Sequence, residues 1–178
     1  MAGELNDFAS SLRLLSYQHF SMHLFWKIAI VIGTFLFMEG VAWFTHKYVM
    51  HGFLWSWHHS HHSYRHGFLE RNDLFALVFS IPAIALIVTG YEVPPLFFLR
   101  YIGFGVTAYG IFYLLFHDIL VHQRIPFKFK AQHPYLKRMI RAHYIHHAKH
   151  TKEDCEAFGF LYAPRKFDER VAKEKSRT

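Results

Sequence analysis

The chain has 178 residues, enough for one domain, and 52% of them are hydrophobic while only 19% are charged. A soluble domain carries about 25% charged residues, so the composition favours a membrane protein. The single cysteine, Cys155, excludes an intramolecular disulfide, a four-cysteine zinc site and a cysteine-ligated iron–sulfur cluster. Any electrons that the protein uses must therefore come from a separate donor.

The order of apolar and polar stretches along the chain predicts an all-α integral membrane bundle that forms a single domain over residues 1–178. Residues 1–23 have no long apolar run, and we expect an amphipathic segment there rather than a secretory signal. Apolar stretches follow at 24–44, 74–90 and 96–116, each within the range of about 17–25 residues that a membrane helix needs. The Pro-rich sequence YEVPP between the last two predicts a tight turn. The remainder leaves room for a fourth helical element and ends in a basic tail at 165–178.

The net charge of +7 is unevenly placed along the chain. Residues 122–178 hold 14 of the 20 Lys and Arg residues, and the 46–73 loop holds three more. Both segments fall on one side of a three-span layout, and the positive-inside rule assigns that side to the cytoplasm. The topology accounts for the basic charge, so no nucleic-acid partner is needed.

Ten of the sixteen histidines fall into two spacings that occur twice, each group near the cytoplasmic end of a span. H-x-x-H-H places three imidazoles on one face of a helix, because each residue advances about 100°. H-x-x-x-x-H places two rings about 140° apart on a regular helix. Either the helix unwinds near its end, or these two rings reach toward different metals. The ten are His46, His51, His58, His61, His62, His117, His122, His143, His146 and His147.

Ten imidazoles exceed what one ion takes and suit two, because first-row metals rarely bind more than six ligands. Imidazole ligates zinc, copper, iron and nickel, so the ligand type alone does not name the metal. E-x-x-H, H-E-x-x-H and nucleotide-binding glycine patterns do not occur, which excludes the corresponding carboxylate di-iron, zinc protease and nucleotide sites. We expect ordinary roles for the other histidines, with His66 and His133 as the strongest candidates for an exception. These others are His19, His23, His59, His66, His133 and His150.

Three acidic residues are candidates to hydrogen-bond metal-ligating imidazoles: Glu39, Asp73 and Asp118. Glu39 lies inside the first span, where ionisable groups are costly and often functional. It precedes His46 by seven residues, so the two share a helix face. The alternative for all three is a helix cap or a solvated charge.

Aromatic residues make up 19% of the chain and offer walls for an apolar substrate or, equally, an interfacial aromatic belt. The candidates nearest the histidine groups are Phe53, Trp55, Trp57, Phe112, Tyr113 and Phe116.

The histidine groups resemble those of the fatty acid hydroxylase/sterol desaturase superfamily of membrane di-iron enzymes. Within it, the chain is most similar to the bacterial β-carotene 3-hydroxylase family. The closer resemblance lies in HKYVMHG (46–52), NDLFALVF (72–79), TAYGIFYLLFHDILVHQR (107–124), YLKR (135–138), AHYIHHA (142–148) and FGFLYAP (158–164). It covers roughly residues 38–164.

This resemblance implies a non-haem di-iron monooxygenase in which the ten histidines bind two iron ions, or zinc as a substitute, and O2 is the co-substrate. It implies hydroxylation of carbon 3 of the β-ionone ring, from β-carotene to β-cryptoxanthin and then zeaxanthin, with no catalytic residue beyond the metal ligands. It also implies a ferredoxin-type electron donor. We expect a bacterial inner-membrane protein with its site at the cytoplasmic face and a carotenoid that enters sideways from the bilayer.

Two other functions remain open from the sequence. One is a fatty acid, sphingolipid or sterol hydroxylase or desaturase of the same superfamily. The other is a histidine-rich membrane metal transporter. Transporters place their ion ligands near the bilayer midplane, whereas these histidines lie at the span ends, which favours an enzyme.

Overall fold

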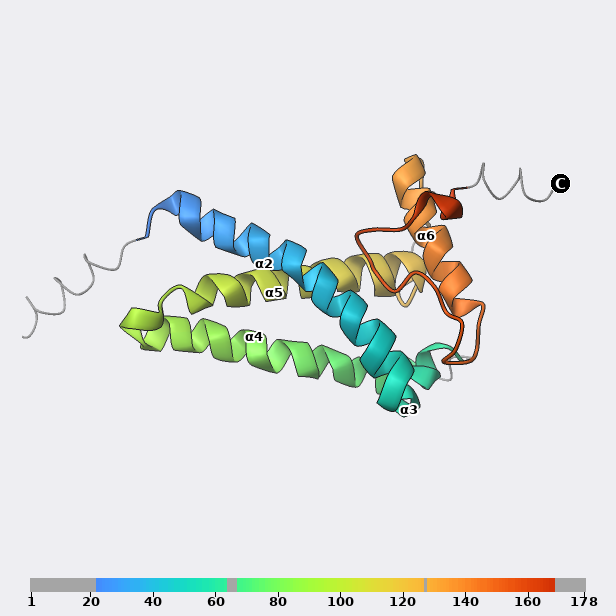
Figure 1. The fold of residues 1–178 in the computed structure, drawn as a ribbon, viewed down its shortest axis with the longest axis horizontal. Helices are drawn as coiled ribbons and strands as arrows, with labels where there is room; N and C mark the ends of the chain where they lie inside the picture. The colour runs from blue at the N-terminus through green and yellow to red at the C-terminus, as the bar shows by residue number, and fades with distance from the viewer. Residues whose placement is uncertain (1–21, 64–66, 127, 169–178) are drawn as a thin grey trace, which may run out of the picture. The chain divides into compact units, whose positions relative to one another are not determined.

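The computed structural model of the protein describes residues 22–63, 67–126 and 128–168, and all regular secondary structure within those ranges is helical. Figure 1 labels the α-helices along the chain. They are α2 (Leu24–Phe44), α3 (Trp55–His58), α4 (Leu74–Glu92), α5 (Leu99–Tyr113) and α6 (Pro134–His147). The all-α prediction is confirmed, and α6 is the fourth helical element that the sequence left room for.

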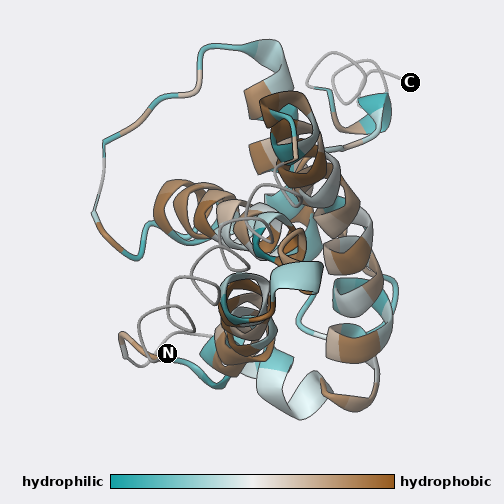
Figure 2. Cartoon of the chain, turned by 90° about the vertical axis from the view of Figure 1, so that its left-hand side faces the viewer, coloured by the Kyte–Doolittle hydropathy of each residue, from teal (hydrophilic) through white to brown (hydrophobic). Residues whose placement is uncertain are grey.

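Three helical stretches are long and apolar enough to cross a membrane: Leu24–Phe53, Arg71–Glu92 and Leu99–Val121. The 21 residues of α2 alone span about 31 Å at 1.5 Å per residue, close to the thickness of a bilayer core. Large apolar side chains on this helix face outward, as Phe37 does with 71% of its surface exposed. Figure 2 shows brown, hydrophobic residues over much of the helical surface. The three predicted spans are therefore confirmed, and lipid is the solvent for these faces.

The described residues fall into two compact units, which we call the hairpin unit and the histidine unit. The described part of the hairpin unit comprises residues 22–35 together with Phe79–Ala108. A 3₁₀ turn at Pro94–Leu96 joins α4 to α5, as the YEVPP sequence predicts. Within this unit α5 has two glycines at close approaches to its neighbours, Gly103 and Gly105. A Cβ added at Gly103 would lie 2.6 Å from a side-chain carbon of Ile87. Only a residue without a side chain allows the two helices to pack this closely.

The described part of the histidine unit comprises residues 36–63, 67–78, 109–126 and 128–168. Its apolar core joins the end of the third span, α6 and the segment 157–167, which we call the strap. The strap has no regular structure before a 3₁₀ turn at Arg165–Phe167. The core residues are Phe116, Val121, Met139, Ala142, Phe160, Ala163 and Phe167. This packing fixes the strap against the helices that carry the histidines.

Residues 1–21 and 169–178 lie outside the described residues. The amphipathic N-terminal segment and the basic tail beyond Asp168 therefore stay predictions, as does the role of His19.

Candidate metal centre

The first and third spans both end in π-helix rather than in regular α-helix. The π-helical segments are Thr45–Phe53, which includes a break at Gly52, and Leu114–Val121. A π-helix bonds residue i to residue i+5, and His122 N donates to His117 O in this way at 2.9 Å. Residues five apart therefore lie above one another. The sequence left two explanations open for H-x-x-x-x-H, an unwound helix or two rings that reach toward different metals. The structure shows the unwound helix, in the form of a π-helix.

Ten buried or half-buried imidazoles form two clusters of five, and in each cluster one ring nitrogen per residue lies within 4.8 Å of the others. The first cluster contains His46, His51, His58, His62 and His146. The second cluster contains His61, His117, His122, His143 and His147. These are the ten residues that the sequence singled out, and both H-x-x-x-x-H pairs stay together within one cluster.

Each H-x-x-H-H group, by contrast, is divided between the clusters. The first and last histidines of a group, such as His58 and His62, are four residues apart and join the same cluster. The middle histidine, His61 or His146, joins the other cluster. A face that holds three imidazoles is wide enough to serve two neighbouring centres, so each group links the two clusters rather than filling one.

The outer nitrogen of each ring in the first cluster donates a hydrogen bond. His46 Nδ1 donates to the Phe158 carbonyl at 3.0 Å, and His58 Nδ1 donates to Asn72 Oδ1 at 2.7 Å. The remaining acceptors are the Lys152 carbonyl for His51, the Lys149 carbonyl for His62 and the Glu156 carbonyl for His146. Because a carbonyl oxygen only accepts, Nδ1 carries the proton in all five rings, and Nε2 presents a lone pair.

The inner nitrogens face one another at distances that suit a shared metal ion. In the first cluster, His58 Nε2 lies 3.1 Å from His46 Nε2 and 3.2 Å from His62 Nε2. Two lone pairs at this distance repel unless a cation lies between them. Nitrogens bound at about 2.1 Å and at right angles around one metal are about 3.0 Å apart, which matches the spacing.

The second cluster has the same inward arrangement. His61 Nε2 lies 2.9 Å from His117 Nε2, and His122 Nε2 lies 2.9 Å from His143 Nε2. His147 Nε2 is buried and has no hydrogen-bond partner among the described residues. A metal ion would satisfy this nitrogen. The donor sets of both clusters thus fit one imidazole-ligated transition metal each.

Burial keeps the cluster histidines neutral. It lowers the pKa of His58 to about 2, that of His146 to about 3 and that of His62 to about 4. Burial, reinforced by repulsion between neighbouring rings, also lowers the pKa of His61 and His143 well below the usual value. Neutral imidazole is the form that binds metals, so at neutral pH these lone pairs are available without the loss of a proton.

Carboxylates surround the second cluster. His117 Nδ1 donates to Asp118 at 2.7 Å, and His61 Nδ1 donates to Glu70 at 3.2 Å. Arg124 lies among the carboxylates, 2.5 Å from Asp73 and 3.7 Å from Glu70. Asp118 thus has the contact that the sequence predicted, whereas Asp73 reaches the histidines only through Arg124 and Glu70.

Glu39 acts on the strap rather than directly on His46. Its Oε1 accepts hydrogen bonds from the backbone N–H groups of Phe160 at 2.8 Å and Leu161 at 2.9 Å, and its Oε2 accepts one from Tyr109 at 2.7 Å. The same strap carries the Phe158 carbonyl that accepts from His46. The predicted hydrogen bond from an imidazole to Glu39 is replaced by this indirect support.

Sequence reasoning missed Glu70 and Asn72, and it missed the phenylalanines of the strap. Phe160 stacks on His46 with centroids 5.7 Å apart, and Phe158 contacts the rings of His46, His51 and His146 edge to face. One available signal was the polar run E-R-N-D directly before the second span, of which only Asp73 was singled out. The backbone carbonyls that accept hydrogen bonds from the histidines cannot be predicted from residue types, because every residue has one.

The histidines expected to be ordinary lie outside both clusters where the structure describes them. His133 is exposed, and His59 contacts Ser63 at the surface. His150 donates from Nδ1 to the His62 carbonyl at 2.6 Å, so it borders the first cluster without joining it. His66 lies outside the described residues.

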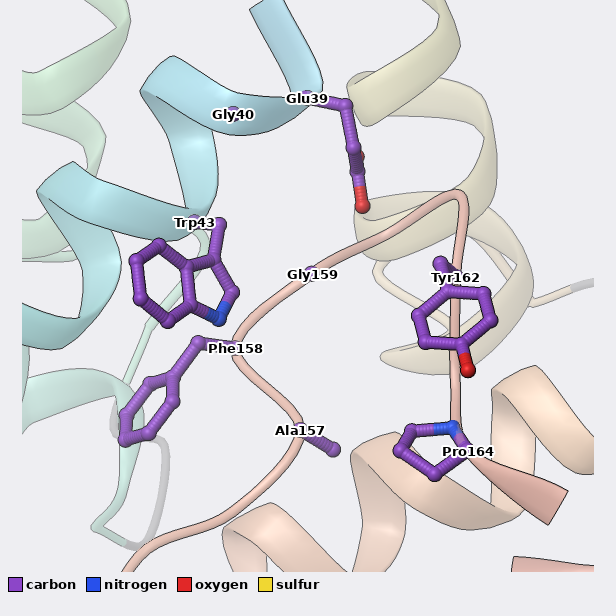
Figure 3. A pocket seen from close by; sticks show the side chains of 8 residues that line it. All are labelled: Glu39, Gly40, Trp43, Ala157, Phe158, Gly159, Tyr162 and Pro164. Carbon is purple, nitrogen blue, oxygen red and sulfur yellow. The ribbon is translucent and has the colours of Figure 1, made fainter.

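A pocket of about 380 Å³ lies between α2 and the strap. Figure 3 shows the Glu39 side chain extending from α2 toward the part of the strap that carries Gly159. The walls are mostly apolar, and Phe158, which lines the pocket, also contacts His46 of the first cluster edge to face. The lining residues are Glu39, Gly40, Trp43, Ala157, Phe158, Gly159, Tyr162 and Pro164. They differ from the six aromatic residues that the sequence suggested, of which Tyr113 instead stacks on His117 at 4.4 Å.

Three apolar spans and two buried five-histidine clusters define a helical membrane protein of the metal-binding class. Residues 31–166 match the family model described as fatty acid hydroxylase, and the chain belongs to this family.

Several proteins with assigned names are similar to this chain over most of its length. A "Beta-carotene hydroxylase" of Pseudescherichia vulneris is 52% identical over 140 residues, which cover 78% of each chain. A protein of the same name from Pantoea ananas is 50% identical over 139 residues, again 78% of each chain. The "Beta-carotene 3-hydroxylase 2, chloroplastic" of Arabidopsis thaliana is 35% identical over 158 residues, 86% of this chain and 51% of that protein. No solved structure matches the chain.

Proposed function

We propose that this chain is an O2-dependent hydroxylase that acts on carbon 3 of the β-ionone ring of carotenoids, taking β-carotene to β-cryptoxanthin and then to zeaxanthin. The observation that carries the proposal is the combination of two five-histidine clusters with bacterial relatives named for β-carotene hydroxylation. The ring position follows the name of the Arabidopsis relative. Residues 1–178 would act as one hydroxylase domain, since the family match runs through both units.

The first and second clusters would each hold one iron ion through the ten histidines, and zinc could occupy the same ligands. When bound, the metals supply the activation of O2 that oxidation of a C–H bond requires. The role of the protein is to keep the imidazoles neutral and to orient their Nε2 atoms toward the centre of each cluster. It does so through the Nδ1 hydrogen bonds and through burial of rings such as His58, His117 and His146.

The reaction must balance with an external reductant. One atom of O2 enters the C–H bond as a hydroxyl group, and the other leaves as water after two electrons and two protons are added. A ferredoxin-type protein would supply the electrons one at a time, since a chain with one cysteine cannot ligate its own iron–sulfur cluster.

The carotenoid would enter from the bilayer and place its ring in the pocket between α2 and the strap. Trp43 and Phe158 supply flat apolar surfaces there, and Phe158 lies against the first cluster. A hydrocarbon gains about 25 cal/mol for each Å² that it removes from water, but little on moving from lipid into an apolar pocket. Shape complementarity and ring stacking would therefore decide the orientation of the substrate.

The protein would lie in the bacterial inner membrane with both clusters at the cytoplasmic face. The support for this side is the placement of 17 of the 20 Lys and Arg residues after the first and third spans. A cytoplasmic face would also give a soluble electron donor access to the centre.

The test is pigment analysis of a β-carotene-producing bacterium that expresses this chain, grown with and without oxygen. We expect β-cryptoxanthin and zeaxanthin with oxygen and unchanged β-carotene without it. His61→Ala should abolish conversion, while His133→Ala, at an exposed histidine outside both clusters, should leave it unchanged.

Other outcomes would point to other functions. Unchanged β-carotene together with new hydroxyl groups or double bonds in cellular lipids would assign the chain to a different activity of its superfamily. Normal pigment conversion by His61→Ala, with altered metal uptake, would instead favour a transporter.

A further inference from the structure

The two clusters differ in what accepts the Nδ1 hydrogen bonds of their histidines. In the first cluster all five acceptors are neutral, namely four backbone carbonyls and the side-chain oxygen of Asn72. In the second cluster two rings, His61 and His117, donate to the carboxylates of Glu70 and Asp118. The imidazole sets are matched in number, but their surroundings differ in charge.

Arg124 connects the acidic groups of the second cluster. Its guanidinium lies 2.5 Å from Asp73, 3.7 Å from Glu70 and 3.8 Å from Asp118. Three carboxylates and one guanidinium leave two negative charges in excess beside this cluster. The side chains of Glu70 and Asp118 are only 8% and 13% exposed, so water screens these charges weakly.

A carboxylate that accepts from Nδ1–H increases the basicity of the opposite nitrogen, which makes the imidazole a stronger donor to a metal. A carbonyl acceptor orients the ring but adds no charge. Excess negative charge nearby also stabilises a bound metal cation, and this stabilisation is stronger in a buried site. Both effects act on the second cluster, and neither acts to the same extent on the first.

We propose that the two metal sites are chemically unequal: the second cluster binds its metal more tightly and makes it more electron-rich, through Glu70 and Asp118, which Arg124 holds in position. The inference rests on the proposed function in one respect, namely that each cluster holds a metal ion. Glu70, Asp118 and Arg124 are positioning residues, since they act on the metal only through His61 and His117.

The experiment follows iron release from the full-length protein, purified in detergent and loaded with iron, after addition of excess chelator. We expect two phases of equal amplitude, with the slower one from the second cluster. Glu70→Gln or Asp118→Asn should accelerate the slow phase by about 10–100-fold and leave the fast phase unchanged, as is typical when a partner of a ligating histidine is lost.

Two further variants test the assignment of the phases. Asn72→Asp gives His58 a carboxylate acceptor in the first cluster and should slow the fast phase. Glu156→Gln is the matched control, because its carboxylate pairs with Lys166 at the surface while only its backbone carbonyl meets His146. It should change neither phase.

The outcomes separate this inference from the proposed function. Fewer than two metal ions per chain after loading would contradict the two-metal site itself. Two ions that leave in one phase, or variants that shift both phases equally, would overturn the inequality alone. Iron Mössbauer spectra of the unaltered protein provide a readout that needs no variant to fold. We expect two quadrupole doublets of equal area, and a single doublet would overturn the inference.

Discussion

His46 and His51 lie in one π-helical segment with ring centroids 5.2 Å apart, although they are five positions apart in the chain. Both contribute to the first cluster. On a regular α-helix the rings would point about 140° apart, so the change of helix type is what brings them together. π-Helical turns are rare and often mark functional sites, and here the reason is geometric.

Removal of one of these rings should cost one metal ion and not two. We expect His51→Ala to lower the metal content from two ions toward one per chain, because the second cluster keeps all five of its histidines. Metal analysis of the purified protein measures this directly. His59→Ala is the matched control, since His59 is exposed and lies outside both clusters, and it should leave the content unchanged. Equal loss in both variants would contradict the ligand set.

Glu39 should stabilise the strap. Glu39→Ala leaves the N–H groups of Phe160 and Leu161 without their acceptor, at a cost of about 1–3 kcal/mol for each group that stays dry. Glu39→Gln keeps a carbonyl oxygen for both N–H groups and should lose much less. Thermal unfolding in detergent compares the two variants, and a Glu92→Ala control at the exposed end of α4 should match the unaltered protein. Equal stability of the Ala and Gln variants would count against the anchoring role.

Much of the fold could be predicted from the sequence, because bilayer thickness fixes the length of an apolar helix. The 24–44 stretch coincides with α2, and 74–90 lies within α4. The candidate ligands could also be predicted from the sequence, since histidines at repeated spacings are easily recognised among apolar residues. Both predictions depend on local patterns along one helix.

The partition of the histidines into two clusters depends instead on contacts between distant segments, and no local pattern contains it. His51 meets His146, 95 residues later, and its Nδ1 donates to a backbone carbonyl whose residue type is irrelevant to the contact. Glu39 was singled out as an ionisable group within a span, but the expected imidazole partner is replaced by backbone N–H groups of the strap. A sequence pattern shows that such a group needs partners without showing which they are.

The pocket should control substrate binding independently of the metals. Gly40 lines it, and a Cβ added there meets no atom within 4 Å, so the branch point of a larger side chain fits on α2 and Gly40→Leu should extend into the pocket. Gly33 lies two turns earlier on the same helix, is equally open and does not line the pocket. We expect Gly40→Leu to raise the KM for β-carotene about tenfold or more with unchanged metal content, and Gly33→Leu to leave both unchanged. Identical kinetics for the two variants would place the substrate elsewhere.

Acid should destabilise the metal-free protein over a defined pH range. Burial lowers the pKa of His62 to about 4 and that of His58 to about 2, whereas the unfolded chain takes up protons near the ordinary value of about 6.5. As the pH falls below about 6.5, protons therefore bind the unfolded state first, and the free energy of unfolding decreases by about 1.4 kcal/mol per pH unit for each such histidine.

The loss continues until the folded pKa is reached, so it should extend below pH 4 for His58 and end near pH 4 for His62. Denaturant unfolding of the metal-free protein in detergent between pH 7.5 and pH 4.5, a range of about three units around the ordinary histidine pKa, measures the slope. A free energy of unfolding that stays constant from neutral pH down to the lower limit would show that the cluster histidines are not held neutral by burial.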